Sequence, residues 1–503
     1  MTATTKKVSP LSPFTASRDR FEALVGLLES RATKLSHSEL EDVIYAAGRD
    51  LLCQLYQNSL DLQALSEPRI EDVVDAQGVP RNSVEPNHKR LLTTIFGDVG
   101  VSRLAYRQRG HANLYPADAL LNLPPEQYSH GLRRLTAIES ARGSFENAVE
   151  AIERATGVHL GKRQTEELTE RAAIDLDSFY AETRRRPDKV KPDDVLVLSA
   201  DGKGIVMRTD ALRDATARAA QSTEPSTRLS KAEKKNRKRM AEVGAVYYAT
   251  PVPRTPGDIL STRNNAAGKA KPAPVAKGKW LIASVVENAS TVISQVFDEA
   301  QRRDPLRLRT WVVLVDGNNH QIDCINAQAK ARKVNVNIVI DFIHVLEYLW
   351  KAAHSFFAER DPAAEIWVAE KAAAVLAGQA GIVAASIARK ATCLQLDLAK
   401  RNGADTCHDY LLNKRPYLNY HTALEQGLPI ATGVIEGAVR YLVKDRMDIT
   451  GARWGLEGAE AVLKLRALHE NGDFDAYWSY HTAQERRRVH EARYAGGIIP
   501  QVA

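Results

Sequence analysis

The sequence has few cysteines and no long uncharged apolar run. Its four cysteines include no Cys-x-x-Cys pair, which argues against a zinc ribbon, and they are too few in 503 residues for a disulfide framework. No window of about 18 apolar residues is free of charge. The first residues (MTATTKKVSPLSPF) also lack the apolar run of a secretory signal. We therefore expect a cytoplasmic protein without a membrane span, preceded by a disordered leader over residues 1–17.

A strong net charge is also lacking, since the formal balance is only +7. The positive charge is nevertheless concentrated in runs. The segment RLSKAEKKNRKR, from Arg228 to Arg239, has seven basic residues in twelve, and three consecutive arginines begin at Arg486. Such runs favour a polyanionic partner because binding releases condensed counterions, although a solvated, flexible segment has the same composition. The candidate DNA contacts in the first run are Arg237, Lys238 and Arg239.

The first third of the chain is predicted to be mainly helical. Ser38 with Glu41 has the spacing of a capping box at the start of a helical pattern, and Gly97-Asp98 has the composition of a hairpin turn. The predicted order is helices over 18–65, a loop over 66–88, a β-hairpin over 90–107 and helices over 129–184.

Two short helices in this region are spaced like a helix-turn-helix. One is expected from Phe145 to Thr156, Gly157 can supply the left-handed residue that ends it, and the second begins near Lys162. In a helix-turn-helix the start of the second helix enters the major groove. A plain helical hairpin in a core has the same pattern. The DNA-contacting candidates on the second helix are Lys162, Arg163, Gln164 and Thr165.

Strand periodicity begins after a linker over 184–194. Three strand candidates, then a helix and two further strands, suggest an antiparallel unit joined to a parallel one, which is the order of a ribonuclease-H-like fold. A long helix-rich stretch follows. The expected strands are 195–200, 205–208, 243–250, 311–315 and 334–340, and the expected helices are 281–303, 345–410, 434–446 and 456–468.

Two of these strands are followed by an aspartate. Asp201 closes the first and Asp316 the fourth, and catalytic groups gather at strand ends in an α/β sheet. A third carboxylate would come from a later helix, where Glu436 lies. Three carboxylates suit two divalent ions about 3.5–4 Å apart, and Mg²⁺ prefers oxygen ligands. Without the ions, at least one carboxyl pKa should be raised.

Each acid has competitors and an ordinary explanation. Asp-Gly after a strand is a common turn signal, and Glu436 alone resembles any exposed glutamate on a helix. Asp341 also follows an apolar strand and competes for the second position. The competitors for the third position are Glu425, Glu457 and Glu460.

At these residues the sequence closely resembles bacterial insertion-sequence transposases of the Kra group, which are related to the Mutator-like lineage. The resemblance covers roughly residues 90–480, and its long C-terminal motif is the most specific. The matching motifs are LSADGKGIVMR (198–208), KRMAEVGAVYYATPVPRTP (238–256), WVVLVDGNNHQID (311–323), VIDFIHVLEYLWKAAH (339–354), LLNKRPYL (411–418) and ATGVIEGAVRYLVKDRMDITGARWGLEGAEAVLKLRAL (431–468).

The resemblance implies an α/β ribonuclease-H-like catalytic core of the Asp-Asp-Glu type, interrupted by an all-helical insertion. By motif, the triad that holds the metal ions is Asp201, Asp316 and Glu436, with two Mg²⁺ ions for which Mn²⁺ substitutes. A Mutator-like signature, Asp341-x-x-His344, implies a supporting role for these two residues. Lys203, Asn318 and Asn319 are expected to support the site beside the acids. The remaining DNA-contacting candidates are Lys444, Arg446 and Trp454; plain core packing is the alternative for Trp454.

The implied activity is that of a DNA transposase. It would bind the terminal inverted repeats of an insertion sequence, hydrolyse DNA and join the 3′-hydroxyl ends to target DNA, acting as a dimer or higher oligomer. The alternatives are a ribonuclease-H-like nuclease without strand transfer, a domesticated DNA-binding protein without catalysis, and a phosphohydrolase with Asp201 as nucleophile. The expected division is an N-terminal DNA-binding region over 18–185, a core over 186–344 with a basic insertion at 209–279, a helical insertion over 345–420, the rest of the core over 421–470 and a basic tail over 471–503.

Overall fold

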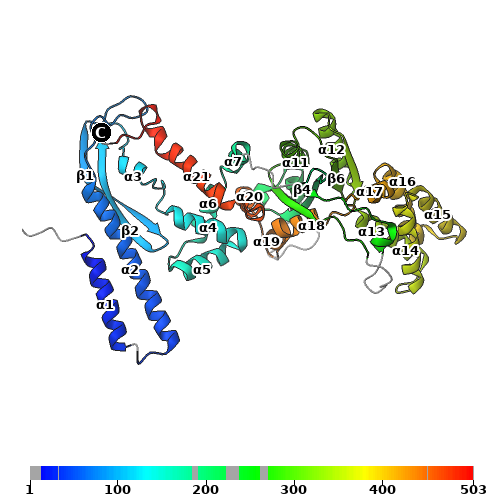
Figure 1. The fold of residues 1–503 in the computed structure, drawn as a ribbon, viewed down its shortest axis with the longest axis horizontal. Helices are drawn as coiled ribbons and strands as arrows, with labels where there is room; N and C mark the ends of the chain where they lie inside the picture. The colour runs from blue at the N-terminus through cyan, green and yellow to red at the C-terminus, as the bar shows by residue number, and fades with distance from the viewer. Residues whose placement is uncertain are drawn as a thin grey trace, which may run out of the picture. The chain divides into compact units, whose positions relative to one another are not determined.

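The protein divides into two compact units in its computed structural model (Figure 1). The N-terminal unit comprises Met1–Thr183 with Phe474–Ala503, and the other unit comprises Arg184–Asp473. No described helix is both long and apolar enough to cross a membrane. The described residues are 13–31, 33–183, 191–221, 237–260, 270–449 and 451–501, so most of the predicted leader, linker and basic run lies outside them.

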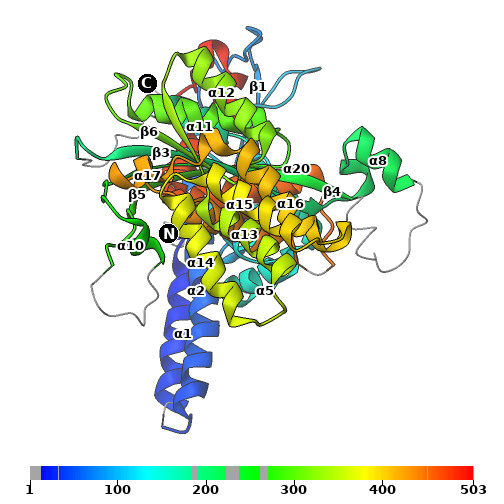
Figure 2. The same ribbon diagram turned by 90° about the vertical axis from the view of Figure 1, so that its right-hand side faces the viewer.

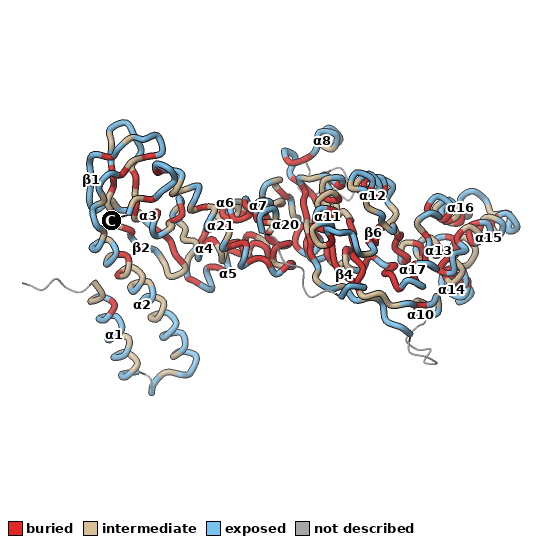
Figure 3. Tube along the Cα trace, turned by 45° about the horizontal axis from the view of Figure 1, so that its top comes forward, coloured by how far each residue is buried: buried red, intermediate tan, exposed pale blue. Residues whose placement is uncertain are grey.

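The N-terminal unit begins with two helices, α1 (Thr15–Arg31) and α2 (His37–Ser66). The predicted capping box is displaced by two residues, because Ser36 and Glu39 form it. Helix α1 also begins inside the stretch predicted as leader, and its Ser17 is buried against Asn58. Figure 3 shows that these two helices carry few buried residues.

The predicted hairpin is present as β1 (Ser83–Thr94) and β2 (Gly97–Arg107). Its turn is not at Gly97-Asp98, because Gly97 already pairs with Thr94 and the connection is made by the two residues between them. Strand β1 also begins within the segment predicted as a loop. One face of the hairpin packs against α2 in a cluster of Leu60, Leu92, Val99, Val101 and Leu123.

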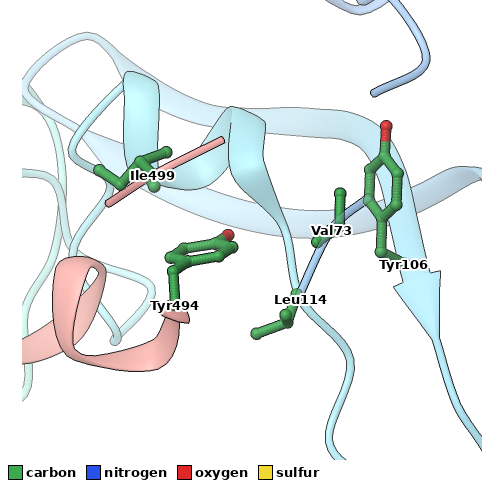
Figure 4. Packing of buried hydrophobic residues seen from close by; sticks show 6 residues of the cluster. Val73, Tyr106, Leu114, Tyr494 and Ile499 are labelled. Atoms are coloured by element: carbon green, nitrogen blue, oxygen red, sulfur yellow. The ribbon is translucent and has the colours of Figure 1, made fainter. Parts of the chain in front are cut away.

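The C-terminal residues are not the basic tail that was predicted over 471–503. They form α21 (Phe474–Val489) and return to the N-terminal unit, where Tyr494 and Ile499 pack with Val73, Tyr106 and Leu114 (Figure 4). Apolar residues so far apart in sequence meet only in the folded chain. The other helices of this unit are α3 (Pro116–Leu120), α4 (His130–Arg142), α5 (Phe145–Thr156), α6 (Lys162–Ala172), α7 (Leu176–Glu182), η4 (Glu491–Arg493) and η5 (Ala495–Gly497).

The other unit contains a mixed five-stranded sheet in the order β5-β4-β3-β6-β7. The pairs β5–β4 and β4–β3 are antiparallel, whereas β3–β6 and β6–β7 are parallel. An antiparallel unit joined to a parallel one was predicted, and the order of the strands agrees with it. The strands are β3 (Val195–Val206), β4 (Lys238–Ala249), β5 (Ala276–Ser284), β6 (Trp311–Val315) and β7 (Val336–Ile340).

Two strand predictions were wrong. Residues 195–200 and 205–208 are not separate strands, because β3 continues through the Asp-Gly-Lys-Gly segment and pairs with β4 along its whole length. A Cβ on Gly202 would lie 2.9 Å from Glu242 Oε2, so glycine here permits close pairing rather than a turn. The start of the predicted helix 281–303 belongs instead to β5, and α11 begins at Ala289.

Helices cover both faces of this sheet. Helix α11 (Ala289–Arg303) packs on β3 and β4, where a Cβ on Gly244 would meet Val296 at 2.4 Å. Helix α18 (Gly433–Val439) contacts the same two strands. Side chains alternate between the faces of a strand, so the face opposite α11 is available to α18. The helix prediction for 434–446 is confirmed as α18, the π-helical turn η3 (Arg440–Lys444) and α19 (Asp445–Met447).

The predicted helix-rich stretch consists of α13 (Phe342–Phe356), α14 (Pro362–Leu376), α15 (Ala380–Cys393) and α16 (Leu398–Asn413), which pack together (Figure 2). The stretch lies between β7 and α18 in the chain. The remaining elements of this unit are η1 (Thr209–Ala211), α8 (Asp214–Gln221), α10 (Pro256–Leu260), α12 (Asn319–Arg332), η2 (Arg415–Tyr417), α17 (Tyr420–Glu425) and α20 (Leu456–Asn471).

Candidate active site

Asp201 and Asp316 lie level with each other on neighbouring parallel strands. The register joins Ser199 to Leu314, and two residues further along both strands it reaches these aspartates. Asp201 had been predicted at the end of a strand, but it lies inside β3. Strand β6 stops at Val315, so the carboxyl groups of Asp201 and Asp316 both lie level with the end of β6. Burial raises the pKa of Asp201, and the charge of Asp316 raises it further. The two acids therefore act on each other electrostatically.

Asp341 extends this row to a third strand. The β6–β7 register pairs Val315 with Ile340, and the Asp341 amide continues it by donating to the Val315 carbonyl at 2.8 Å. Parallel strands lie about 4.8 Å apart, and side chains at one level share a face. The three aspartates, Asp201, Asp316 and Asp341, thus form a row across β3, β6 and β7, which we call the aspartate row.

Glu436 is joined to the aspartate row through Thr432. The Thr432 hydroxyl oxygen lies 2.5 Å from Asp341 Oδ2 and 2.8 Å from Glu436 Oε1. One hydroxyl proton cannot serve two carboxylates at once, so a second proton is needed when both contacts are hydrogen bonds. Partial desolvation raises the pKa of Glu436, as does Asp341, although the Glu436 side chain keeps contact with solvent. This pair of acids favours holding a proton or a cation.

His344 completes a group of possible metal ligands. Its Nδ1 lies 3.3 Å from Asp341 Oδ2, and one ligand atom from each of Asp341, His344 and Glu436 lies within 4.8 Å of the others. Asp341 is fully buried and also caps α13 by accepting from the Ile343 amide at 2.9 Å. Asp341 and His344, expected only to support the site, are therefore the residues in closest association with Glu436.

The competitors for the third acid differ from Glu436. Glu460 is held away from the site by the Ser284 hydroxyl at 2.9 Å and the Val285 amide at 2.8 Å. Glu425 and Glu457 are exposed, as is Glu436. None of these three competitors belongs to the group of possible metal ligands among the described residues, and neither Asp201 nor Asp316 belongs to it.

The asparagines and the lysine beside the acids are already engaged. The Asn318 side chain caps α12, and its backbone N–H donates to Asp316 Oδ1 at 2.8 Å. Asn319 accepts a hydrogen bond from Lys414, and Lys203 Nζ lies 3.6 Å from Asp448 Oδ2. Asn318 therefore contacts one of the acids, whereas Asn319 and Lys203 are engaged with Lys414 and Asp448.

Three residues near the acids were missed by the sequence reasoning. Glu242 lies on β4, and its pKa is raised by burial and by Asp201. The Tyr410 hydroxyl donates to the Asp316 carbonyl at 3.4 Å, and the buried Lys414 reaches Asn319. Tyr410 lies in the last helix of the helix-rich stretch and Lys414 directly follows it, so both reach the acids only through the fold. The one sequence signal for them was the LLNKRPYL motif, which contains Lys414.

Two DNA-contact predictions near Glu436 are corrected by burial. Trp454 is 6% exposed; its ring nitrogen donates to the Met447 carbonyl at 3.1 Å and its backbone pairs with the residues after β3. Arg446 is 5% exposed and lies over the Trp454 ring at 4.6 Å. Both are core residues, which agrees with the packing alternative that was given for Trp454. Lys444 is exposed and remains free to meet a phosphate.

The helix-turn-helix spacing is present in the N-terminal unit. Helix α5 ends at Gly157, whose φ of 70° is left-handed, and α6 begins at Lys162. Lys162 and Arg163 are exposed, where they pair with glutamates. Gln164 is half-buried. Thr165 is fully buried and donates to the Gly161 carbonyl at 3.0 Å, so the prediction that it contacts bases was wrong.

Of the candidates in the basic run, Arg239 has a structural role. Its guanidinium donates to the carbonyls of Val285, Ala211 and Val286 at 2.7, 3.3 and 3.3 Å. Arg237 and Lys238 are half-buried at the start of β4.

Comparison with protein-family models and with curated protein sequences finds no match. The function of the protein is therefore inferred from the geometry of the site and from the motifs quoted above.

Proposed function

We propose that the protein is a metal-dependent DNA transposase of the Asp-Asp-Glu type with a ribonuclease-H-like core. The observation that carries the proposal is the gathering of Asp201, Asp316, Asp341 and Glu436 at one end of the mixed sheet. The sheet order is compatible with such a core. The helix-rich stretch between Asp316 and Glu436 also agrees with the insertion that the resemblance implies.

The residues present fit divalent cations. Like-charged carboxyl groups with raised pKa values are stabilised by a shared cation, and carboxylate oxygens are the ligands that Mg²⁺ and Mn²⁺ prefer. Asp201, Asp316 and Glu436 would hold the ions, with Asp341 and His344 adjoining Glu436. When bound, the ions would activate the attacking oxygen and neutralise charge on the phosphate.

The chain's own residues would position the DNA and manage protons. Lys203 lies near enough to Asp201 to act on its charge, and Lys444 is exposed in the π-helical turn that follows the helix of Glu436. Both would supply positive charge to a phosphate chain. The Thr432 hydroxyl lies within hydrogen-bonding distance of both Asp341 and Glu436 and would orient them. The exposed Lys162 and Arg163 at the start of α6 would contact the duplex.

The proposed reaction has two phosphoryl-transfer steps. In the first, a water oxygen bonds to phosphorus at the element's end as the bond to the 3′ oxygen breaks, which leaves a 3′-hydroxyl. In the second, this hydroxyl oxygen bonds to a phosphorus of target DNA as another phosphorus–oxygen bond breaks. One bond replaces another in each step, so neither a nucleotide cofactor nor a covalent protein intermediate is required.

The test compares Asp201→Asn and Glu436→Gln with Glu457→Gln, a matched change at an exposed glutamate. Cleavage and joining of end-containing DNA are measured with Mg²⁺ or Mn²⁺. We expect the first two variants to lose cleavage while still binding DNA, and the third to cut normally. Near wild-type cutting by both site variants would exclude the proposed triad. Cleavage by the wild type without joined products would identify a nuclease instead.

A further inference from the structure

A small cavity in the N-terminal unit has walls that are rich in positive charge. Its volume is about 160 Å³, and it lies between the β1–β2 hairpin and the residues after α21. We call it the arginine cavity. Its lining residues are Arg90, Arg103, Tyr115, Asp118, Leu123, Pro124, Pro125, Val489, His490, Arg493 and Tyr494.

The basic residues outnumber the acidic ones in this lining. Arg103 Nε lies 2.8 Å from Asp118 Oδ1, and Arg90 Nη1 lies 3.8 Å from Asp118 Oδ2. Asp118 is the only acid among the lining residues, and the exposed Arg493 adds a third guanidinium group. Glu67 and Glu126 act on Arg103 and Arg90 from outside the lining, so the surplus of positive charge is confined to the residues that line the cavity. Buried charge without a counter-charge is costly. The cavity therefore favours an anion.

The pairing of Arg103 with Asp118 is close but poorly aligned. Both side chains belong to residues only 7% exposed. Neither Arg103 Nε nor Asp118 Oδ1 has a partner in hydrogen-bonding geometry among the described protein groups. Arg103 is held in place by stacking over Tyr115 at 4.3 Å and by donating to the His88 carbonyl at 3.0 Å. Its guanidinium is thus fixed in position, and its Nε faces Asp118 at ion-pair distance without a well-aligned hydrogen bond.

His490 forms another part of the wall. Its Nε2 lies 2.8 Å from the Leu123 carbonyl, which can only accept, so Nε2 carries the hydrogen. The charged groups that act on it are Asp118, Arg493 and Arg486, and burial, the largest influence, lowers its pKa. A bound anion would favour the protonated ring.

We propose that the arginine cavity binds a single phosphate group. Guanidinium groups match the oxygens of phosphate in paired hydrogen bonds, and the net charge of the three arginines and Asp118 is positive. The volume is below the roughly 300–1,000 Å³ typical of sites for whole organic ligands, so it suits inorganic phosphate or the terminal phosphate of a larger molecule. The proposal does not rest on the transposase activity, because the cavity contains none of the acids of the candidate active site.

The experiment measures thermal unfolding of the full chain with increasing sodium phosphate against sodium chloride at equal ionic strength. The variants are Arg493→Glu and Arg493→Gln, with Arg487→Glu as the matched control at an exposed arginine of α21. We expect phosphate at about ten times its Kd to raise the melting temperature of the wild type and of Arg487→Glu by a few degrees. The gain should be saturable, at least halved in Arg493→Gln and lost in Arg493→Glu.

Two results would overturn the proposal. One is no saturable gain with phosphate in the wild type, and the other is an equal gain in all the variants, which would indicate a general salt effect. A competition arm identifies the source of the phosphate: a duplex with 5′-terminal phosphates and the same duplex without them are added to the phosphate-bound protein. Displacement by the first duplex alone supports a terminal phosphate of DNA, whereas displacement by neither supports free phosphate.

Discussion

Two groups of acids, one in each compact unit, have opposite electrostatic surroundings. In the N-terminal unit, Arg133 contacts both oxygens of Glu485 at 2.7 Å. Burial alone would raise the pKa of Asp175, but hydrogen bonds from His481 and Arg488 lower it below its usual value. Each of these acids has a cationic partner within the chain.

At the candidate active site of the other unit the acids face one another. Burial and Asp316 raise the pKa of Asp201, and desolvation and Asp341 raise that of Glu436. Like charges in contact cost stability unless a cation enters. The contrast distinguishes acids that pair within the fold from the acids that we propose hold cations.

The largest expected effect is on catalysis. Asp316→Asn removes a charge from the centre of the aspartate row while keeping its shape. We expect metal-dependent cleavage to fall by about 10³-fold or more, a loss of roughly 4 kcal/mol of transition-state stabilisation. Single-turnover cleavage of a labelled end duplex measures it, and DNA binding measured by anisotropy should be unchanged. A fall of less than tenfold would contradict a place for Asp316 among the metal ligands.

The next largest effect is expected on stability, when a buried ion pair of the N-terminal unit is broken. Glu485→Gln removes the closer charge partner of the buried Arg133 and leaves it only Glu126 at 3.7 Å. We expect the N-terminal unit to lose about 3 kcal/mol of unfolding free energy. The comparison is Glu167→Gln, which removes the partner of the exposed Arg163 and should cost less than about 1 kcal/mol. Denaturant unfolding of the full chain measures both. Equal costs would mean that burial does not distinguish these pairs.

A smaller effect is expected where a neutral group orients the acids. Thr432→Val removes the hydroxyl between Asp341 and Glu436, and we expect cleavage to fall by about 10–100-fold, as for other residues that orient metal ligands. Thr432→Ser keeps the hydroxyl and should restore most of the rate. The metal concentration needed for half-maximal cleavage should rise in the valine variant alone. An unchanged metal requirement would point to a purely structural role.

The smallest effect concerns stability and pH in the absence of metal. The raised pKa of Asp201 means that its folded form holds a proton more tightly than its unfolded form. The favourable contribution of Asp201 to the free energy of unfolding is therefore present below its pKa in the unfolded chain and is lost as pH rises through its pKa in the folded protein. Asp201→Asn does not titrate, so without metal it should be more stable than the wild type near pH 8 by about 0.5 kcal/mol, a value reduced for partial exposure, and lose this advantage near pH 3.

Added Mg²⁺ or Mn²⁺ should reverse that order at pH 8, because the wild type binds the cation more tightly than the variant. The gain in melting temperature of the wild type should be smaller at pH 4, where protons compete for the carboxyl groups. Melting curves at both pH values test this. A metal-dependent gain of equal size in Asp201→Asn would exclude Asp201 from the ligands.

Much of the fold followed from local patterns. The apolar runs before Asp316 and Asp341 predicted β6 and β7, and the helical periodicity after them predicted the helix-rich stretch. Local turn signals were less reliable. Asp201-Gly202 has the composition of a turn but continues β3, because the pairing with β4 runs through both residues and outweighs turn propensity.

For the site, the sequence identified the four acids and His344 as candidates, but it could not tell which of them touch. The association of Asp341 with Glu436 depends on Thr432, which no spacing rule singled out. Glu242 escaped notice because it stands at the start of an apolar strand, and its closeness to Asp201 arises from the pairing of β3 with β4. Thr165 and Trp454 looked available because exposure is not encoded in residue type.

By itself the sequence determined β6, β7 and most of the helices, and it placed Asp316 and Asp341 directly after strands, since these features depend on periodicity and on residues close in the chain. Only the tertiary structure decided the common level of Asp201, Asp316 and Asp341, the place of α21 and the formation of the arginine cavity. Strand register and the burial of charge are settled by contacts between residues far apart in sequence, where many weak interactions compete and the best-packed arrangement prevails.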